Sequence, residues 1–166
     1  GSLSLRMQSR TTTHTAKISE YLLDMGEPSD SYDSAAAYHH ALHSIKQELT
    51  RHPIVIETRG FPAGEFVEVV ADLAIERWGV DSGNATLTVR WFAGESEDAR
   101  PEFSFHYSDA ERDLGWHHHE QEHVEGWGHF QERTGSTEYS YESYTFPSQN
   151  PARLVWEIMS LLSSRV

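Results

Sequence analysis

Histidines concentrate in one short stretch of this chain, and their spacing could build a chemical site. Five of the eleven histidines lie between positions 117 and 129, and His106 lies shortly before them. Imidazole is the commonest protein ligand for transition metals, and because it titrates near neutral pH it also serves acid–base chemistry. A functional site is therefore most strongly indicated here, and three interpretations of it stay open.

The first interpretation is a metal site, and it requires the segment 116–120 to be extended. Alternate side chains of a strand point to opposite faces of the sheet. His117 and His119 would then share one face, while His118 and Glu120 would share the other. Two imidazoles two positions apart on one face can bind the same ion.

The remaining ligands of such a site must come from outside that segment. His123, past a turn, could complete a three-nitrogen set with His106, or with His129 from a neighbouring strand. We take His106, His117, His119 and His123 as the candidate metal ligands. Neutral imidazole nitrogens, bound at about 2.0–2.1 Å, suit a divalent transition metal such as zinc.

The second interpretation is acid–base catalysis without a metal. A histidine beside a carboxylate can take a proton from a ribose hydroxyl, and a second histidine can donate one to the leaving oxygen. The candidate catalytic residues are His106, His119 and Glu120. Arg133 or Arg90 could offset the charge of a phosphate, so this arrangement would suit cleavage of RNA.

The third interpretation gives the histidines no chemical role. They would then lie on a solvent-facing strand, with the aromatic side chains of Trp116, Trp127 and Phe130 packing underneath. The protein would in that case be a binding domain for another protein, without a site. The sequence alone does not choose among the three interpretations.

Composition narrows the class of protein. The chain has 166 residues, which suits one domain with a sizeable core, and it has no cysteine. Disulfides, thiolate metal sites and cysteine nucleophiles are therefore excluded. The sequence shows no apolar run of the ~20 residues that a membrane helix needs, and no basic-then-apolar leader. We expect a soluble cytoplasmic protein that does not bind membranes.

The charge is strongly acidic. The chain has 26 Asp and Glu but only 13 Lys and Arg, which gives a net charge of -13. Only two of the basic residues, Lys17 and Lys46, are lysines. Acidic surfaces that are poor in lysine are typical of halophilic proteins, whose charges are screened by salt. In dilute salt this charge would disfavour a nucleic-acid partner, but in molar salt it loses that meaning.

Apolar residues at helical spacing predict three helices. The first covers residues 18–25, before Gly26 and Pro28, and the second covers residues 34–50. The third begins after Asn150 and Pro151, a helix-capping pair, and carries an apolar stripe that consists of Leu154, Ile158, Leu161 and Leu162.

Between the helices the apolar period changes to two, which is typical of strands with one buried face. Besides the histidine stretch, the predicted strands are 54–56, 66–76, 85–92, 102–107 and 137–146. The segment 108–115 is expected to be a turn. We therefore predict an α+β domain over residues 15–166, after a disordered tail over residues 1–14. One antiparallel sheet of about five to six strands would carry N-terminal helices and a C-terminal amphipathic helix on one face.

One resemblance bears on function. The run 105–110 (FHYSDA), followed by His117–His119 and His123, resembles the aromatic and aspartate-containing strand and the "HHxH"-type segment of TumE-like toxins. Those proteins are small components of prokaryotic toxin–antitoxin pairs, and the similarity covers about residues 66–162. The resemblance implies an intracellular toxin that acts on RNA and is neutralised by a cognate antitoxin protein. The alternative from the residues alone is a non-catalytic metal- or ligand-binding domain.

Overall fold

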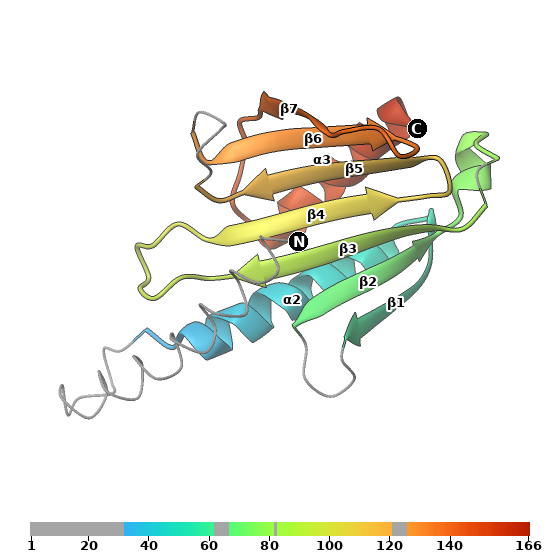
Figure 1. Cartoon of the computed structure of the whole chain (residues 1–166). Coiled ribbons are helices and arrows are strands. Elements are labelled where there is room, and N and C mark those ends of the chain that lie inside the picture. The colour runs from blue at the N-terminus through green and yellow to red at the C-terminus, as the bar shows by residue number, and fades with distance from the viewer. Residues whose placement is uncertain (1–31, 62–66, 82, 121–125) are drawn as a thin grey trace.

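The computed structural model describes residues 32–61, 67–81, 83–120 and 126–166, and it shows an α+β fold (Figure 1). One sheet of seven strands runs in sequence order, and each strand pairs antiparallel with the next. The strands are β1 (Val55–Phe61), β2 (Glu68–Leu73), β3 (Ala85–Phe92), β4 (Glu102–Ser108), β5 (Arg112–His118), β6 (Gly128–Thr134) and β7 (Ser140–Ser143). The predicted fold class is confirmed, with seven strands in the place of five or six.

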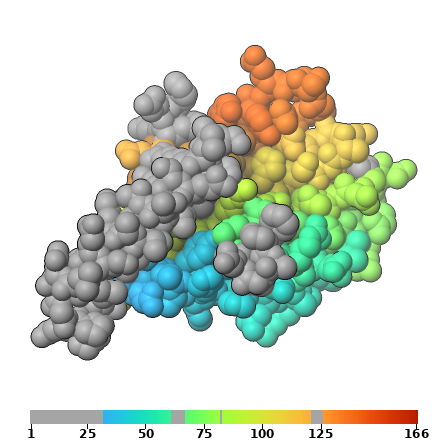
Figure 2. Space-filling view, turned by 60° about the horizontal axis from the view of Figure 1, so that its bottom comes forward, coloured from blue at the N-terminus to red at the C-terminus, as the bar shows by residue number. Residues whose placement is uncertain are grey.

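Helices α2 (Ser34–Arg51) and α3 (Pro151–Arg165) both lie behind the sheet in Figure 1. In α2 the Asp33 side chain caps the first turn by accepting a hydrogen bond from the backbone N of Ala36. In Figure 2 the blue surface of α2 adjoins the green surface of the first hairpin, and α2 contacts both β1 and β2.

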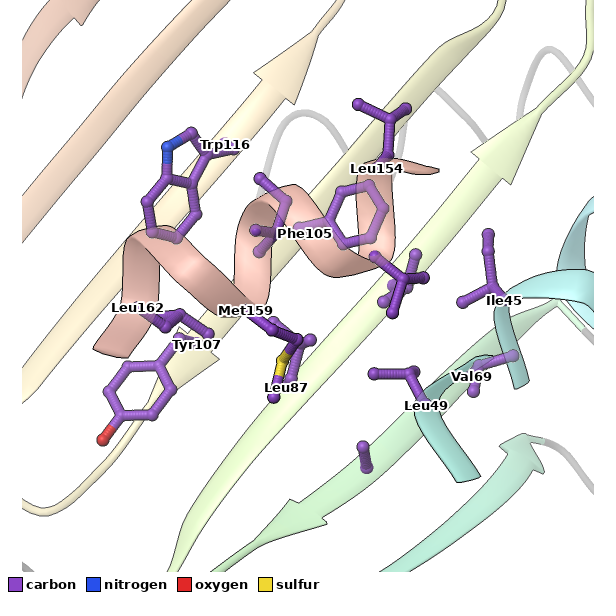
Figure 3. Packing of buried hydrophobic residues seen from close by; sticks show 14 of the residues in the cluster. Ile45, Leu49, Val69, Leu87, Phe105, Tyr107, Trp116, Leu154, Met159 and Leu162 are labelled. Atoms are coloured by element: carbon purple, nitrogen blue, oxygen red, sulfur yellow. The ribbon is translucent and has the colours of Figure 1, made fainter. Parts of the chain in front are cut away.

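Helix α3 begins as its sequence predicts. The side chain of Asn150 accepts a hydrogen bond from the backbone N of Arg153, and Pro151 occupies the first turn. Leu154, Ile158 and Leu162 of the predicted stripe are buried, as is Met159 beside them, whereas Leu161 is only partly buried. Figure 3 labels three of these buried residues. Those residues are Leu154, Met159 and Leu162.

The face of the sheet toward the helices holds the core. Leu87 of β3 lies opposite Tyr107 of β4, and the next pairs along these strands are Val89 with Phe105 and Trp91 with Phe103. All six side chains are buried. Because side chains alternate across a strand, the residues between them face the other side of the sheet, which carries no helix among the described residues. That outer face carries most of the histidine cluster.

Several predicted boundaries were wrong. The predicted strand 54–56 is longer, because β1 pairs with β2 as far as Phe61. The segment 108–115 is not one long turn, because the Asp109 carboxylate accepts hydrogen bonds from the backbone N of Glu111 and Arg112 and closes a tight turn. Strand β5 consequently begins at Arg112. The predicted strand 66–76 ends at Leu73, where a 3-10 turn (Ile75–Trp78) follows. The last strand covers only Ser140–Ser143.

Two predicted elements, the tail 1–14 and the helix 18–25, lie outside the described residues, as does His123. Among the helices that are described, neither α2 nor α3 is long and apolar enough to cross a membrane.

Candidate metal centre

Three histidines from the β5–β6 hairpin converge on the outer face of the sheet. His117 lies in β5, His119 directly follows that strand, and His129 lies in β6. Each offers one ligand atom, and these atoms all lie within 4.8 Å of one another. We call His117, His119 and His129 the histidine triad.

The hairpin register positions the triad. His117 lies directly opposite His129, and their rings stack with centroids 5.1 Å apart. The neighbouring pair, Trp116 and Phe130, faces the core with its ring centroids 4.8 Å apart. Since adjacent side chains point to opposite faces, burying this aromatic pair forces both histidines onto the outer face. The backbone N of His119 donates to the carbonyl of Trp127, which continues the hairpin beyond β5.

The triad is buried, although its residues are polar. The exposed fractions are 7% for His117, 8% for His119 and 1% for His129. Both ring nitrogens of His117 and both of His129 lack a hydrogen-bond partner among the described residues. Buried polar atoms in proteins almost always have a partner, and leaving one unpaired costs about 1–3 kcal/mol. An arrangement of this kind is expected where the nitrogens serve a bound ligand.

His119 has a defined orientation within the triad. Its Nδ1 lies 2.9 Å from the main-chain carbonyl oxygen of Glu120, so this nitrogen is the donor and carries the ring proton in the neutral form. The lone pair is thereby assigned to Nε2. A hydrogen bond to a carbonyl is a common way to orient a metal-binding imidazole.

Two histidines of the triad, His117 and His129, are held in their neutral form by a lowered pKa. Burial lowers the pKa of His117 well below its ordinary value of 6.5, and the neighbouring histidines add to the effect. Burial also lowers the pKa of His129 to about 4, with help from His119. A polar contact with the Trp127 backbone opposes this shift but falls short of hydrogen-bond geometry. Neutral imidazole is the form that binds metal ions, so His117 and His129 are ready to bind at neutral pH.

His106 lies beside the triad but is not part of it. Its ring centroid is 6.5 Å from that of His117. His106 Nε2 is 3.5 Å from Asp113 Oδ1, and the other oxygen of Asp113 accepts a 2.8 Å hydrogen bond from Arg133 Nε. Burial lowers the pKa of His106, and the Asp113 carboxylate opposes that shift. The side chain of His106 is 32% exposed, so it lies at the solvent edge of the cluster.

Gly115 makes room for this arrangement. A Cβ at Gly115 would lie 2.7 Å from His117 Nε2 and 3.1 Å from His106 Nδ1, closer than side chains normally approach. Gly115 pairs with His106 across β4 and β5, on the outer face. The two imidazoles therefore converge over a residue that has no side chain.

The triad fits a transition metal by its chemistry and approximately by its geometry. Nitrogens bound at 2.0–2.1 Å in tetrahedral geometry would be about 3.3 Å apart, so ligand atoms within 4.8 Å need only small ring rotations. Three imidazoles without a thiolate suit zinc, copper, nickel or cobalt more than calcium or magnesium, which prefer oxygen ligands.

The structure distributes the predicted site residues as follows. His117 and His119 come together as predicted, and of the two outside partners that were considered, His106 and His129, it is His129 that joins them. Glu120 is exposed and contributes its main-chain carbonyl to His119. The carboxylate next to His106 is that of Asp113, which the sequence analysis did not single out.

The third interpretation, a solvated strand, does not fit the burial of these residues. The exposed fractions of the triad are all below 9%. Trp116 and Phe130 do pack underneath, as that interpretation predicted, but the histidines above them are also enclosed. The remaining histidine of the tract, His118, points to the helix side of the sheet.

His118 has a structural environment and provides a test of this division. Its ring stacks on Phe103 at 4.8 Å, and its Nδ1 lies 2.7 Å from the carbonyl oxygen of Pro101. We expect His118→Phe to keep the stacking but to lose the hydrogen bond, and so to destabilise the fold by about 1–2 kcal/mol. Metal affinity should be unchanged. Denaturant unfolding and a zinc titration measure the two effects, and a loss of zinc binding would contradict the assignment.

Comparison with known proteins adds no family to this description. No protein-family model, no curated protein and no solved structure matches the chain. The resemblance to TumE-like toxins accordingly stays a prediction from the sequence, and the function must be argued from the histidine triad itself.

Proposed function

We propose that this protein binds one divalent transition-metal ion, zinc in the first place, through the histidine triad. The observation that carries the proposal is the burial of three convergent imidazoles, two of which have no hydrogen-bond partner for any ring nitrogen among the described residues. A metal ion would use one nitrogen of each ring. It would thereby offset part of the cost of burying them.

Three protein ligands distinguish this proposed centre from a purely structural zinc site. Structural sites use four protein ligands, whereas centres with three leave a coordination position for water or another small molecule. Among the described residues, which do not include His123, the triad is such a three-ligand set. The function that the geometry supports best is therefore a metal-binding domain whose ion can take a further ligand.

One observation favours the acid–base alternative, namely the environment of His106. Asp113 is placed to orient its imidazole, and Arg133 in turn holds Asp113. This pair is independent of a metal and would serve an RNA-cleaving site of the kind that the TumE-like resemblance implies. This second candidate is tested by comparing the growth of a host that expresses the wild-type gene with that of a host that expresses the His106→Ala variant. Growth should stop only with the wild-type gene. Equal growth would count against it.

The metal proposal is tested on protein purified without an affinity tag. We expect elemental analysis and zinc calorimetry to give one zinc per chain. His129→Ala or His119→Ala should lower the zinc affinity by at least about 100-fold, or roughly 2.7 kcal/mol. His118→Phe is the matched control, because it removes a histidine of the same tract that faces the other side of the sheet.

Two results would contradict the proposal. One is the absence of stoichiometric zinc, cobalt, nickel or copper uptake by the folded wild-type protein. The other is unchanged zinc affinity in both alanine variants, which would place any bound ion elsewhere. Circular dichroism of each variant verifies that a loss of binding does not result from unfolding.

A further inference from the structure

We propose that the metal centre takes a small exogenous ligand with two features, an oxygen that binds the ion and an adjacent O–H or N–H that donates to Nδ1 of His106. The inference rests on the proposed metal site and specifies the chemistry of its remaining position. Water is the smallest ligand of this class, and a hydroxamic acid is a larger one.

The position of the ligand follows from the close approach of His106 to His117 over Gly115. His117 Nε2 and His106 Nδ1 lie 2.7 and 3.1 Å from the point that a Cβ of residue 115 would occupy. One of these nitrogens belongs to the triad and the other belongs to the residue at its solvent edge. The two nitrogens therefore lie close together, and a small molecule bound to an ion at the triad would be within reach of His106 Nδ1.

The need for a hydrogen-bond donor on the ligand follows from the orientation of His106. Its Nε2 faces the Asp113 carboxylate at 3.5 Å, and the carboxylate can only accept a hydrogen bond when ionised. The proton of the neutral imidazole is therefore assigned to Nε2, and Nδ1 becomes an acceptor. Arg133 fixes Asp113 from the other side, which keeps the assignment stable. An acceptor beside His117 would favour ligands that carry a hydrogen to donate.

The size of the ligand follows from burial. The triad residues are each less than 9% exposed, whereas the side chain of His106 is 32% exposed. Of His106 and the three triad residues, His106 is the one that is most accessible to solvent. We infer that the ligand enters there and that only its metal-binding group fits inside.

Cobalt-substituted protein provides the test, because the visible absorption of cobalt(II) reports changes in its ligands. Acetohydroxamate offers both an oxygen donor and an N–H, whereas acetate offers oxygen donors alone. We expect acetohydroxamate to shift the spectrum of the wild-type protein in a saturable manner. In His106→Leu its affinity should fall by at least about fivefold, the size of one ordinary hydrogen bond. The affinity for acetate should be the same in both proteins.

The outcomes separate the two proposals. If cobalt does not bind stoichiometrically to the wild-type protein, the metal site itself is wrong. If cobalt binds but acetohydroxamate leaves its spectrum unchanged, or if His106→Leu weakens both ligands equally, the metal site stands and the role of His106 is refuted. His40→Leu, which changes an exposed histidine of α2, is the control for the surface substitution. His106→Gln, which keeps a side-chain acceptor, should retain part of the preference for acetohydroxamate.

Discussion

Acidification from about pH 7 to about pH 4.5 should destabilise the metal-free protein by roughly 2–3 kcal/mol through His129 alone. Burial and the neighbouring histidine lower the pKa of His129 from 6.5 to about 4. Between pH 6.5 and about pH 4, His129 therefore binds a proton in the unfolded chain but stays neutral in the folded protein. The free energy of unfolding falls throughout that window and levels off once the pH is below the folded pKa.

His117 acts in the same direction, since its pKa is also lowered by burial. The many carboxylates of the chain titrate near the lower end of the same range, so the total pH dependence is not diagnostic by itself. The decisive measurement compares wild-type protein with His129→Phe by denaturant unfolding at several pH values. Between pH 4 and 6.5 the free energy of unfolding of the variant should depend less steeply on pH, by the amount that corresponds to about one proton. Parallel curves would show that His129 is not held neutral.

Zinc should counter this acid sensitivity near neutral pH. A ligand that binds only the folded state at 100 times its dissociation constant stabilises it by about 2.7 kcal/mol. Because the ion competes with protons for the same nitrogens, this stabilisation should vanish as the histidines protonate. The same unfolding series with and without zinc measures both effects in one experiment.

The parts of the fold that the sequence predicted are those set by local patterns. Helix α3 combines the cap Asn150, Pro151 and an apolar stripe, and strand β3 alternates without interruption from Ala85 to Trp91. In both cases the pattern and the observed boundary agree at the start of the element. Local signals of this kind need no knowledge of the partner strand or helix.

The third ligand of the triad was harder to predict, because it depends on the register of a hairpin. Alternation alone placed His117 and His119 on one face, but it cannot say which residue of the next strand lies opposite. The signal was the aromatic pair: if Trp116 and Phe130 are matched in the core, His117 must meet His129. A register shifted by one residue would have moved His129 to the helix side.

Asp113 was missed for a related reason. It lies in the segment that was predicted as a turn, and a turn offers no face to which a side chain can be assigned. The side chain of Asp109 shortens that turn through its two hydrogen bonds to the backbone. Strand β5 therefore starts early enough to bring Asp113 onto the same face as His106. A single side chain that closes a turn is a weaker signal for predicting structure from sequence than a repeated spacing of apolar residues.

Substitution of Gly115 by alanine should damage the metal site and spare the fold. The new Cβ would meet His117 Nε2 at 2.7 Å and His106 Nδ1 at 3.1 Å, so both rings must move. These atoms are the far ends of side chains, which can rotate, and Gly115 does not need a left-handed backbone conformation. We expect the zinc affinity to fall at least about tenfold, or roughly 1.4 kcal/mol. The free energy of unfolding of the metal-free protein should change by less than about 1 kcal/mol.

Gly128 provides the contrast that makes this result interpretable, because its neighbour is backbone. A Cβ there would overlap the carbonyl oxygen of Tyr144, whose backbone N donates to the Gly128 carbonyl at 2.9 Å. The backbone cannot rotate away without breaking that hydrogen bond, so Gly128→Ala should destabilise the fold by more than about 2 kcal/mol. If Gly115→Ala were also destabilising to this degree, its loss of zinc would reflect unfolding. If it bound zinc like the wild type, the position of His117 over Gly115 would not matter for the site.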